Sequence, residues 1–216
     1  MSLPKSLLAL ATVFSSACLL AGNAGADQPN PESGANSPDV QVSLRNEAIV
    51  GSETGKKVQR AYLTSGTNQF VFEVPAGFQM DASNPQKIVL SDVNCTCFLT
   101  FRFAGRMPAG AKELQTDSCR SLALSRFPGA KISNESYDFA GNHGGPVFDL
   151  QWQNSSGTEQ TARIMFIPSP AGIIEFNLLT TSSKFSDGRS LLNSLLGSFH
   201  SNEGGKLEVT QRPDKS

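Results

Sequence analysis

The stretch that decides the fold runs from residue 147 to residue 200 and reads VFDLQWQNSSGTEQTARIMFIPSPAGIIEFNLLTTSSKFSDGRSLLNSLLGSFH. It holds three strand-like runs, at residues 147–153, 161–167 and 172–181, which are rich in β-branched and aromatic residues. The breakers NSSG and PSP separate these runs. Short breakers favour antiparallel hairpins over crossover connections, so the pattern predicts an antiparallel meander.

The end of this stretch changes from strand-like to helical periodicity. Five apolar residues recur there at helical spacing: Leu191, Leu192, Leu195, Leu196 and Phe199. They predict a helix over residues 186–200 with one apolar face, which needs an apolar partner. The preceding strands can supply that partner from five apolar residues: Ile164, Phe166, Ile174, Phe176 and Leu178.

Toward the N-terminus, a fourth strand-like run at residues 136–140 completes the meander. Residues 109–127 carry apolar positions at helical spacing and predict a helix that ends at Pro128-Gly129. Further strands are predicted at five earlier segments: residues 40–44, 58–63, 68–74, 87–90 and 95–103. The order strands, helix, four-strand meander and helix predicts an α+β sandwich over residues 39–200, in which one antiparallel sheet packs against helices.

The N-terminus has the pattern of a secretory signal peptide. Residues 1–26 contain a cation at Lys5, an apolar run over residues 7–20 and the small residues Ala24-Gly25-Ala26 at their end. The apolar run is too short and too rich in Ser and Ala for a membrane span. We therefore expect a periplasmic or secreted protein that has no transmembrane segment after cleavage near Ala26.

A cysteine inside this segment leaves a second form of export open. A lipoprotein signal is cleaved before a cysteine that then carries lipid, and Cys18 is the candidate. We rank soluble release above a lipid anchor, because Ser15 stands where such signals usually carry Leu. After the signal peptide, residues 27–38 predict a disordered linker, and residues 201–216 predict a polar C-terminal tail.

Composition limits the classes of partner. Removing residues 1–26 removes one of the 18 cationic residues and none of the 19 acidic ones, which leaves a net charge of −2. A near-neutral balance argues against nucleic acid as a partner. The 14 Phe against one Trp and two Tyr indicate a buried aromatic core.

Three passages resemble the PsbP-like family. They are the turn FEVPAGF at residues 72–78, the final strand and helix at residues 172–199, and the single long helix between the two halves of the sheet. The resemblance covers residues 68–200 and implies an antiparallel sheet between helices. It also implies assembly or interaction with other proteins, with no shared catalytic set. We therefore expect a non-catalytic domain that contacts an unknown protein partner and holds no cofactor.

Three cysteines remain after signal removal. Cys95 and Cys97 point to one face of a predicted strand, and Cys119 lies on the apolar stripe of the predicted helix. In an oxidising compartment this arrangement predicts a disulfide from Cys119 to Cys95 or to Cys97. The alternative is a soft-metal site at the C-x-C pair, although His143 and His200 lack ligand spacing to it. A periplasmic small-molecule or soft-metal-binding protein is thus the alternative function.

The loop GNHGGP at residues 141–146 is the candidate functional loop, with His143, Gly144 and Gly145 as its candidate residues. Its amides could bind an anion, with His143 as acid or base. We rank above this a hairpin loop whose glycines permit positive φ. A hydrolase would need His143 beside a serine or a carboxylate, and the chain contains no nucleophile elbow, phosphate loop or H-E-x-x-H motif.

Four charged residues stand inside apolar strand runs: Arg102, Asp149, Arg163 and Glu175. Because side chains alternate along a strand, we expect these four on the solvent face of the sheet, as a ladder of charge pairs. Such surface pairs contribute about 0–1 kcal/mol each, so they would have little effect on stability.

Overall fold

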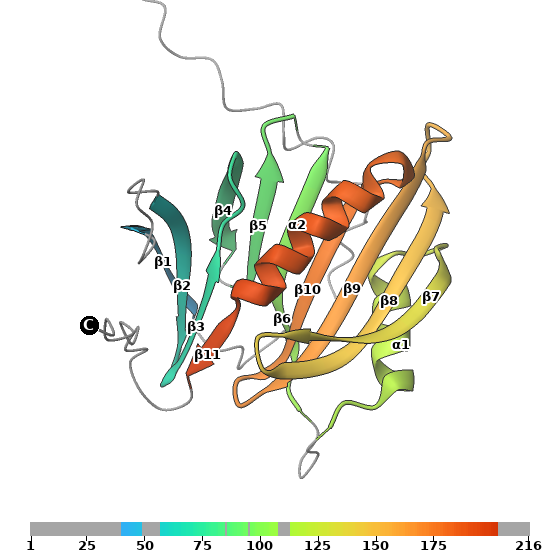
Figure 1. Cartoon of the computed structure of the whole chain (residues 1–216). Coiled ribbons are helices and arrows are strands. Elements are labelled where there is room, and N and C mark those ends of the chain that lie inside the picture. Colours follow the sequence, from blue (N-terminus) through green and yellow to red (C-terminus); the bar gives the residue numbers. More distant parts are fainter. Residues whose placement is uncertain (1–39, 49–56, 85, 95, 108–112, 203–216) are drawn as a thin grey trace, which may run out of the picture.

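The computed structural model describes residues 40–48, 57–84, 86–94, 96–107 and 113–202, and their strands form two antiparallel sheets (Figure 1). The four-stranded sheet has, in spatial order, β1 (Val40–Ala48), β2 (Lys57–Ser65), β3 (Asn68–Glu73) and β11 (His200–Asn202). The seven-stranded sheet has, in spatial order, β4 (Phe78–Asn84), β5 (Lys87–Asp92), β6 (Cys97–Gly105), β10 (Gly172–Thr181), β9 (Glu159–Ser169), β8 (His143–Gln153) and β7 (Lys131–Ala140). The helices are α1 (Thr116–Arg126), η1 (Ser182–Lys184) and α2 (Phe185–Ser198).

The fold class predicted from the sequence, an α+β sandwich of one antiparallel sheet against helices, is wrong. Strands hold 61% of the described residues and helices 19%, and the strands form a sandwich of two sheets. The division arises at the turn after β3. Val74 still donates its backbone N–H to Gln59 of β2, but Pro75 has no N–H with which to extend the ladder. Gly77, at φ 80°, then turns the chain into β4 of the other sheet.

The antiparallel meander is confirmed. β7 pairs with β8, β8 with β9 and β9 with β10, all antiparallel, and β10 pairs with β6 to join the earlier strands. The sequence pattern missed β4 and β11, and β11 extends past the predicted domain boundary at residue 200. Helix α1 begins at Thr116, later than the predicted start at residue 109. The predicted signal peptide and linker lie outside the described residues, as do Cys95 and the tail beyond residue 202.

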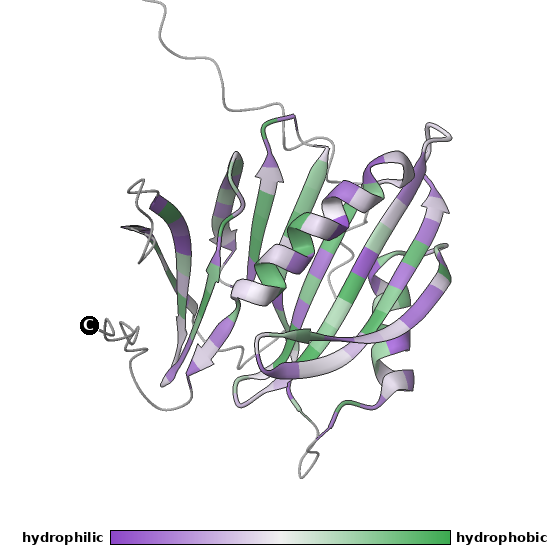
Figure 2. Ribbon diagram, in the orientation of Figure 1, coloured by the Kyte–Doolittle hydropathy of each residue, from purple (hydrophilic) through white to green (hydrophobic). Residues whose placement is uncertain are grey.

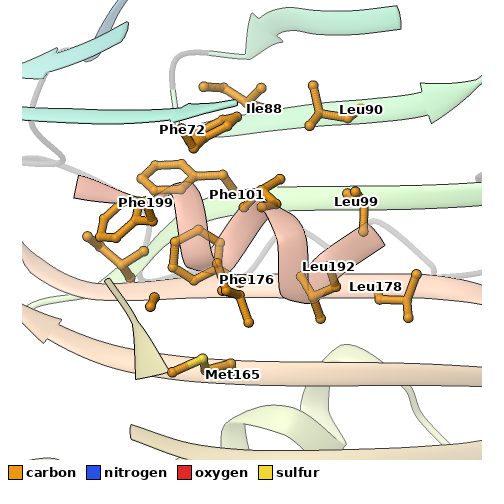
Figure 3. Close-up of a cluster of buried hydrophobic side chains, with 14 of the residues drawn as sticks. Phe72, Ile88, Leu90, Leu99, Phe101, Met165, Phe176, Leu178, Leu192 and Phe199 are labelled. Atoms are coloured by element: carbon orange, nitrogen blue, oxygen red, sulfur yellow. The ribbon is translucent and has the colours of Figure 1, made fainter. Parts of the chain in front are cut away.

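The main core lies between the two sheets and under α2, which crosses one face of the seven-stranded sheet (Figure 1). Phe72 of β3, Phe101 of β6, Phe176 of β10 and Phe199 meet there, with ring centroids 5.0–5.9 Å apart along the chain of contacts (Figure 3). Figure 2 shows the hydrophobic residues gathered in the central strands of this sheet. The phenylalanine-rich composition thus forms the expected aromatic core.

The predicted apolar face of α2 is confirmed, and four of its five residues are buried: Leu192, Leu195, Leu196 and Phe199. Its predicted partner is only partly right. Ile174, Phe176 and Leu178 share its cluster, whereas Ile164 and Phe166 belong to a second cluster under α1. The register explains the difference, because Phe176 of β10 is opposite Met165 of β9 and the residues flanking Met165 point to the other face.

The predicted ladder of surface charge pairs is wrong for three of its four residues. Asp149 and Arg163 are 7% and 8% exposed, and Glu175 is fully buried. Nη1 of Arg163 donates to Oδ1 of Asp149 over 2.9 Å, and Nε of Arg126 in α1 donates to Oε2 of Glu175 over 3.0 Å. The alternation rule fails because α1 packs on one face of the central strands and α2 on the other.

Candidate functional site

The candidate loop is the tip of the hairpin formed by β7 and β8. Ala140 pairs with His143, so Gly141 and Asn142 form a two-residue turn, and Gly141 has φ 57°. The N–H of Gly141 donates to the backbone oxygen of Leu196 over 2.9 Å. The turn is therefore held against the end of α2. Gly141, its first residue, has the positive φ that was predicted for a glycine of a hairpin loop.

His143 connects this hairpin to the four-stranded sheet. Its Nε2 lies 2.6 Å from Oγ of Ser201 in β11, and both side chains are half-buried. An imidazole bonded to a serine hydroxyl is also the pair that a serine hydrolase uses. In the described part of the chain, no carboxylate contacts His143 to orient it as a triad would require. The hydrogen bond between His143 and Ser201 instead joins the seven-stranded sheet to the four-stranded sheet.

The two glycines after His143 are required by close packing. A Cβ on Gly145 would lie 1.7 Å from the backbone oxygen of Phe166 in β9. A Cβ on Gly144 would lie 2.6 Å from the Tyr137 ring and 2.9 Å from the Phe139 ring. Gly144 thus forms a flat surface across which both rings lie.

Tyr137 and Phe139 are the functional candidates that sequence reasoning missed. They lie two residues apart on one face of β7, and they are 65% and 60% exposed. Their ring centroids are 5.7 Å apart at an interplanar angle of 76°, an edge-to-face pair. The alternation Tyr-Asp-Phe places both rings on one face of a strand, but it does not indicate whether that strand is at the end of a sheet, so the sequence assigned the aromatic residues to the core.

β7 is an end strand of the seven-stranded sheet, so one side of its backbone faces no neighbouring strand. The closing pair of a two-residue turn is hydrogen-bonded across the hairpin, and bonded pairs alternate with non-bonded ones. The backbone groups of Phe139, Tyr137 and Glu135 therefore point away from β8. In agreement, the N–H of Phe139 donates to Oδ1 of Asp138 over 2.9 Å. The exposed rings and the open backbone edge thus belong to the same residues.

The carboxylates of β7 are both paired within the chain. Arg120 of α1 donates to both oxygens of Glu135 over 2.7 Å, and it also bonds Asp117. This guanidinium lowers the pKa of Glu135. Oδ2 of Asp138 lies 3.7 Å from Nη2 of Arg163. Both carboxylates thus have a cation partner, although Arg120 is shared with Asp117 and Arg163 with Asp149.

Cys97 does not form the predicted disulfide with Cys119. Cys97 and Cys119 are buried free thiols in separate core clusters, because Cys97 faces α2 and Cys119 lies between α1 and the opposite face. The disulfide between Cys97 and Cys119 is therefore not formed, and Cys95, the other predicted partner, lies outside the described residues. Burial raises the pKa of both thiols to about 11.

Over the described ranges, no group of three or more His, Cys, Asp or Glu is arranged to hold a metal ion. The helices within these ranges are not long and apolar enough to cross a membrane.

No protein-family model and no curated protein matches this chain. Solved structures similar to it include PsbP from the cyanobacterium Synechocystis sp. PCC 6803, at 13% identity and a TM-score of 0.41, over 78% of this chain and 95% of that one. LpqN, involved in cell envelope biogenesis of Mycobacterium tuberculosis, matches at 12% identity and a TM-score of 0.42, over 76% and 92%. A Bacteroides thetaiotaomicron protein matches at 13% and 0.45, over 63% of this chain and 46% of that one, less than half of its length.

The PsbP likeness agrees in its coarse form with the resemblance found in the sequence. At identities of 12–13% and TM-scores of 0.41–0.45, these likenesses transfer no activity and no partner to this chain.

Proposed function

We propose that this chain is an exported, non-catalytic domain of the PsbP-like kind that acts through protein–protein contacts. The observation that carries the proposal is the edge-to-face pair of Tyr137 and Phe139, more than half exposed on an end strand. Aromatic side chains are enriched at protein interfaces, where they bury a large area at a small cost in side-chain entropy. We call this surface the β7 edge: the outward backbone of residues 134–140 together with the two rings and Gly144.

The β7 edge is held in place before any partner arrives. The hairpin is bonded to β11 through His143 and Ser201, and to the end of α2 through Gly141 and Leu196. The rings are further supported by the flat surface at Gly144. A preformed surface loses little conformational freedom on binding, so more of the contact energy is available for affinity.

The export part of the proposal comes from residues 1–26 and is tested by mass. We expect the intact mass of the protein recovered from its cells to begin at Asp27. A mass that begins at a diacylated Cys18 would replace soluble release by a lipid anchor. Recovery of the uncleaved chain alone would contradict export.

The contact part is tested by site-specific photo-cross-linking in living cells. A benzophenone amino acid replaces Tyr137 in one variant, and in a control it replaces Leu44 of β1, an apolar residue that is 43% exposed in the other sheet. We expect a discrete protein adduct from position 137 and none from position 44. The absence of any adduct, or the same adducts from both positions, contradicts the proposal.

One observation favours a second candidate, a serine hydrolase: the 2.6 Å contact between His143 and Ser201. Hydrolysis of an activated ester separates the two candidates, with Ser201→Ala and His143→Ala as test variants. Ser183→Ala, at an exposed serine of η1, is the matched control. We expect all four proteins to show the same background rate. Turnover by the native chain that both test variants abolish would establish the hydrolase instead.

A further inference from the structure

We infer that the occupant of the β7 edge is a second copy of this chain, with the two β7 strands paired antiparallel about a two-fold axis. The inference rests on the proposed function, because it uses the same surface and names the partner. Closed two-fold pairs are the commonest form of homo-oligomer, and they bring one surface patch against itself. Whether the β7 edge fits itself is then a matter of backbone, rings and charge.

The backbone fits itself in more than one register. The backbone N–H and C=O groups of Glu135, Tyr137 and Phe139 point away from β8. In a paired dimer they must face the corresponding backbone groups of the second copy. In one register Tyr137 lies opposite the second copy's Tyr137. In the neighbouring registers Tyr137 lies opposite the second copy's Glu135 or Phe139. Opposite residues of an antiparallel pair share a face of the sheet. In each of these registers the four rings therefore gather on one continuous face of the paired sheets.

The charges of β7 are partly neutralised within each copy. A natural sheet edge is commonly protected from another edge by unpaired charges. Here Glu135 is held by Arg120, which also pairs with Asp117, and Asp138 lies beside Arg163, which also pairs with Asp149. These ion pairs reduce, without cancelling, the negative charge that the two carboxylates present to the second copy. The cation of this strand, Lys131, stands before the irregularity between Ile132 and Asn134, outside the regular segment.

β4, the end strand at the opposite edge of the same sheet, has features that protect an edge from pairing with another strand. β4 is seven residues long, and its pairing with β5 is irregular between Asp81 and Asn84. Asp81 is exposed, and its carboxylate accepts the backbone N–H of Ser83. β7 is ten residues long, and its pairing with β8 is regular from Asn134 to Ala140. Of the two edges, β7 is the one suited to strand pairing.

The β7 edge is small for a dimer interface. One strand and two rings per copy fall short of the roughly 800 Å² per partner typical of stable complexes. We therefore expect a reversible dimer with a dissociation constant on the order of 10 μM. Such a dimer is monomeric when dilute and assembles where the exported chain is concentrated.

Sedimentation velocity of the mature chain from about 1 to 300 μM tests the inference. We expect a monomer that shifts to a dimer across this range. Tyr137→Thr and Phe139→Thr should each raise the dissociation constant by about tenfold or more, since threonine keeps the strand propensity and removes the ring. Leu44→Thr, which removes an exposed apolar side chain from the other sheet, should leave it unchanged.

Two variants at Glu135 separate the contribution of its backbone N–H to the dimer from that of its side chain. Glu135→Pro removes the outward N–H, whereas Glu135→Gln keeps that N–H and loses only the ion pair with Arg120. We expect the Pro variant to remain monomeric and the Gln variant to dimerise within about threefold of the native chain. Circular dichroism confirms the fold of each variant. If the Pro variant does not fold, Gly144→Ala replaces it, since its Cβ would displace the Tyr137 ring and weaken the dimer.

The outcomes distinguish this inference from the proposed function. A chain that stays monomeric throughout, yet forms an adduct with a different protein from position 137, overturns the second copy and keeps the protein-contact function. A chain that is monomeric and forms no adduct overturns both. A dimer that is insensitive to the changes at Tyr137, Phe139 and Glu135 places the interface elsewhere and also overturns the inference.

Discussion

Replacing Arg163 by Met should lower the free energy of unfolding by about 3–5 kcal/mol, because it leaves the Asp149 carboxylate buried without its cation. Nη1 of Arg163 contacts both carboxylate oxygens, at 2.9 and 3.1 Å, and both side chains are only 9% exposed. Solvent therefore screens this pair little, and the value of about 0–1 kcal/mol for surface pairs does not apply. The amide of Asn134, at 3.3 Å, is a long hydrogen bond that offsets little of the loss.

Urea unfolding at neutral pH measures this change, followed by the fluorescence of Trp152, the chain's one tryptophan. This residue stacks on Phe127 at 4.8 Å, so its emission reports the loss of packing near α1. Combining Arg163→Met with Asp149→Leu should recover most of the lost stability, since the uncompensated charge is then removed as well. Arg189→Met, at an exposed arginine of α2, is the control and should change stability by less than about 0.5 kcal/mol. A loss below about 1 kcal/mol for Arg163→Met, or no recovery in the double variant, would refute the reasoning.

Four further outcomes follow from local geometry. Gly145→Ala should lower the free energy of unfolding by more than about 3 kcal/mol in the same assay, because its Cβ would lie 1.7 Å from a β9 carbonyl oxygen. Cys97 and Cys119 should resist iodoacetamide at about pH 8 until urea unfolds the chain, as mass spectrometry would show. Since their folded pKa of about 11 exceeds the ordinary 9.0, the unfolded chain loses these protons first, and stability should fall between pH 9 and 11. Ser201→Ala should cost about 1 kcal/mol, measured by thermal unfolding, through loss of its bond to His143.

Local periodicity was sufficient to predict the elements whose partners are close in sequence. The α2 stripe from Leu192 to Phe199 and the four-strand meander depend on spacing and short turns, and both are present. Assignment of strands to sheets depends instead on contacts between distant segments. β3 and β4 are neighbours in the chain, yet they lie in different sheets. The alternation of apolar and polar residues in these two segments does not indicate which sheet each strand joins.

The candidate site shows the same limit at the level of single residues. The sequence drew attention to His143, Gly144 and Gly145 because the loop is unusual, and the structure gives them packing and bonding roles. Tyr137 and Phe139 could not be separated from core aromatics, because only the strand order makes β7 an end strand. Glu175 was misplaced for a related reason, since its burial requires α1 on the second face of the sheet.

The claim that two copies of this chain pair through the β7 edge is tested most directly by NMR, from the backbone amide signals of the isotope-labelled chain during dilution. We expect the amides of Glu135, Tyr137 and Gly144 to shift as the concentration rises, while those of β4 stay constant. Amide signals that do not change with concentration, or that change along β4 and not along β7, would contradict this account.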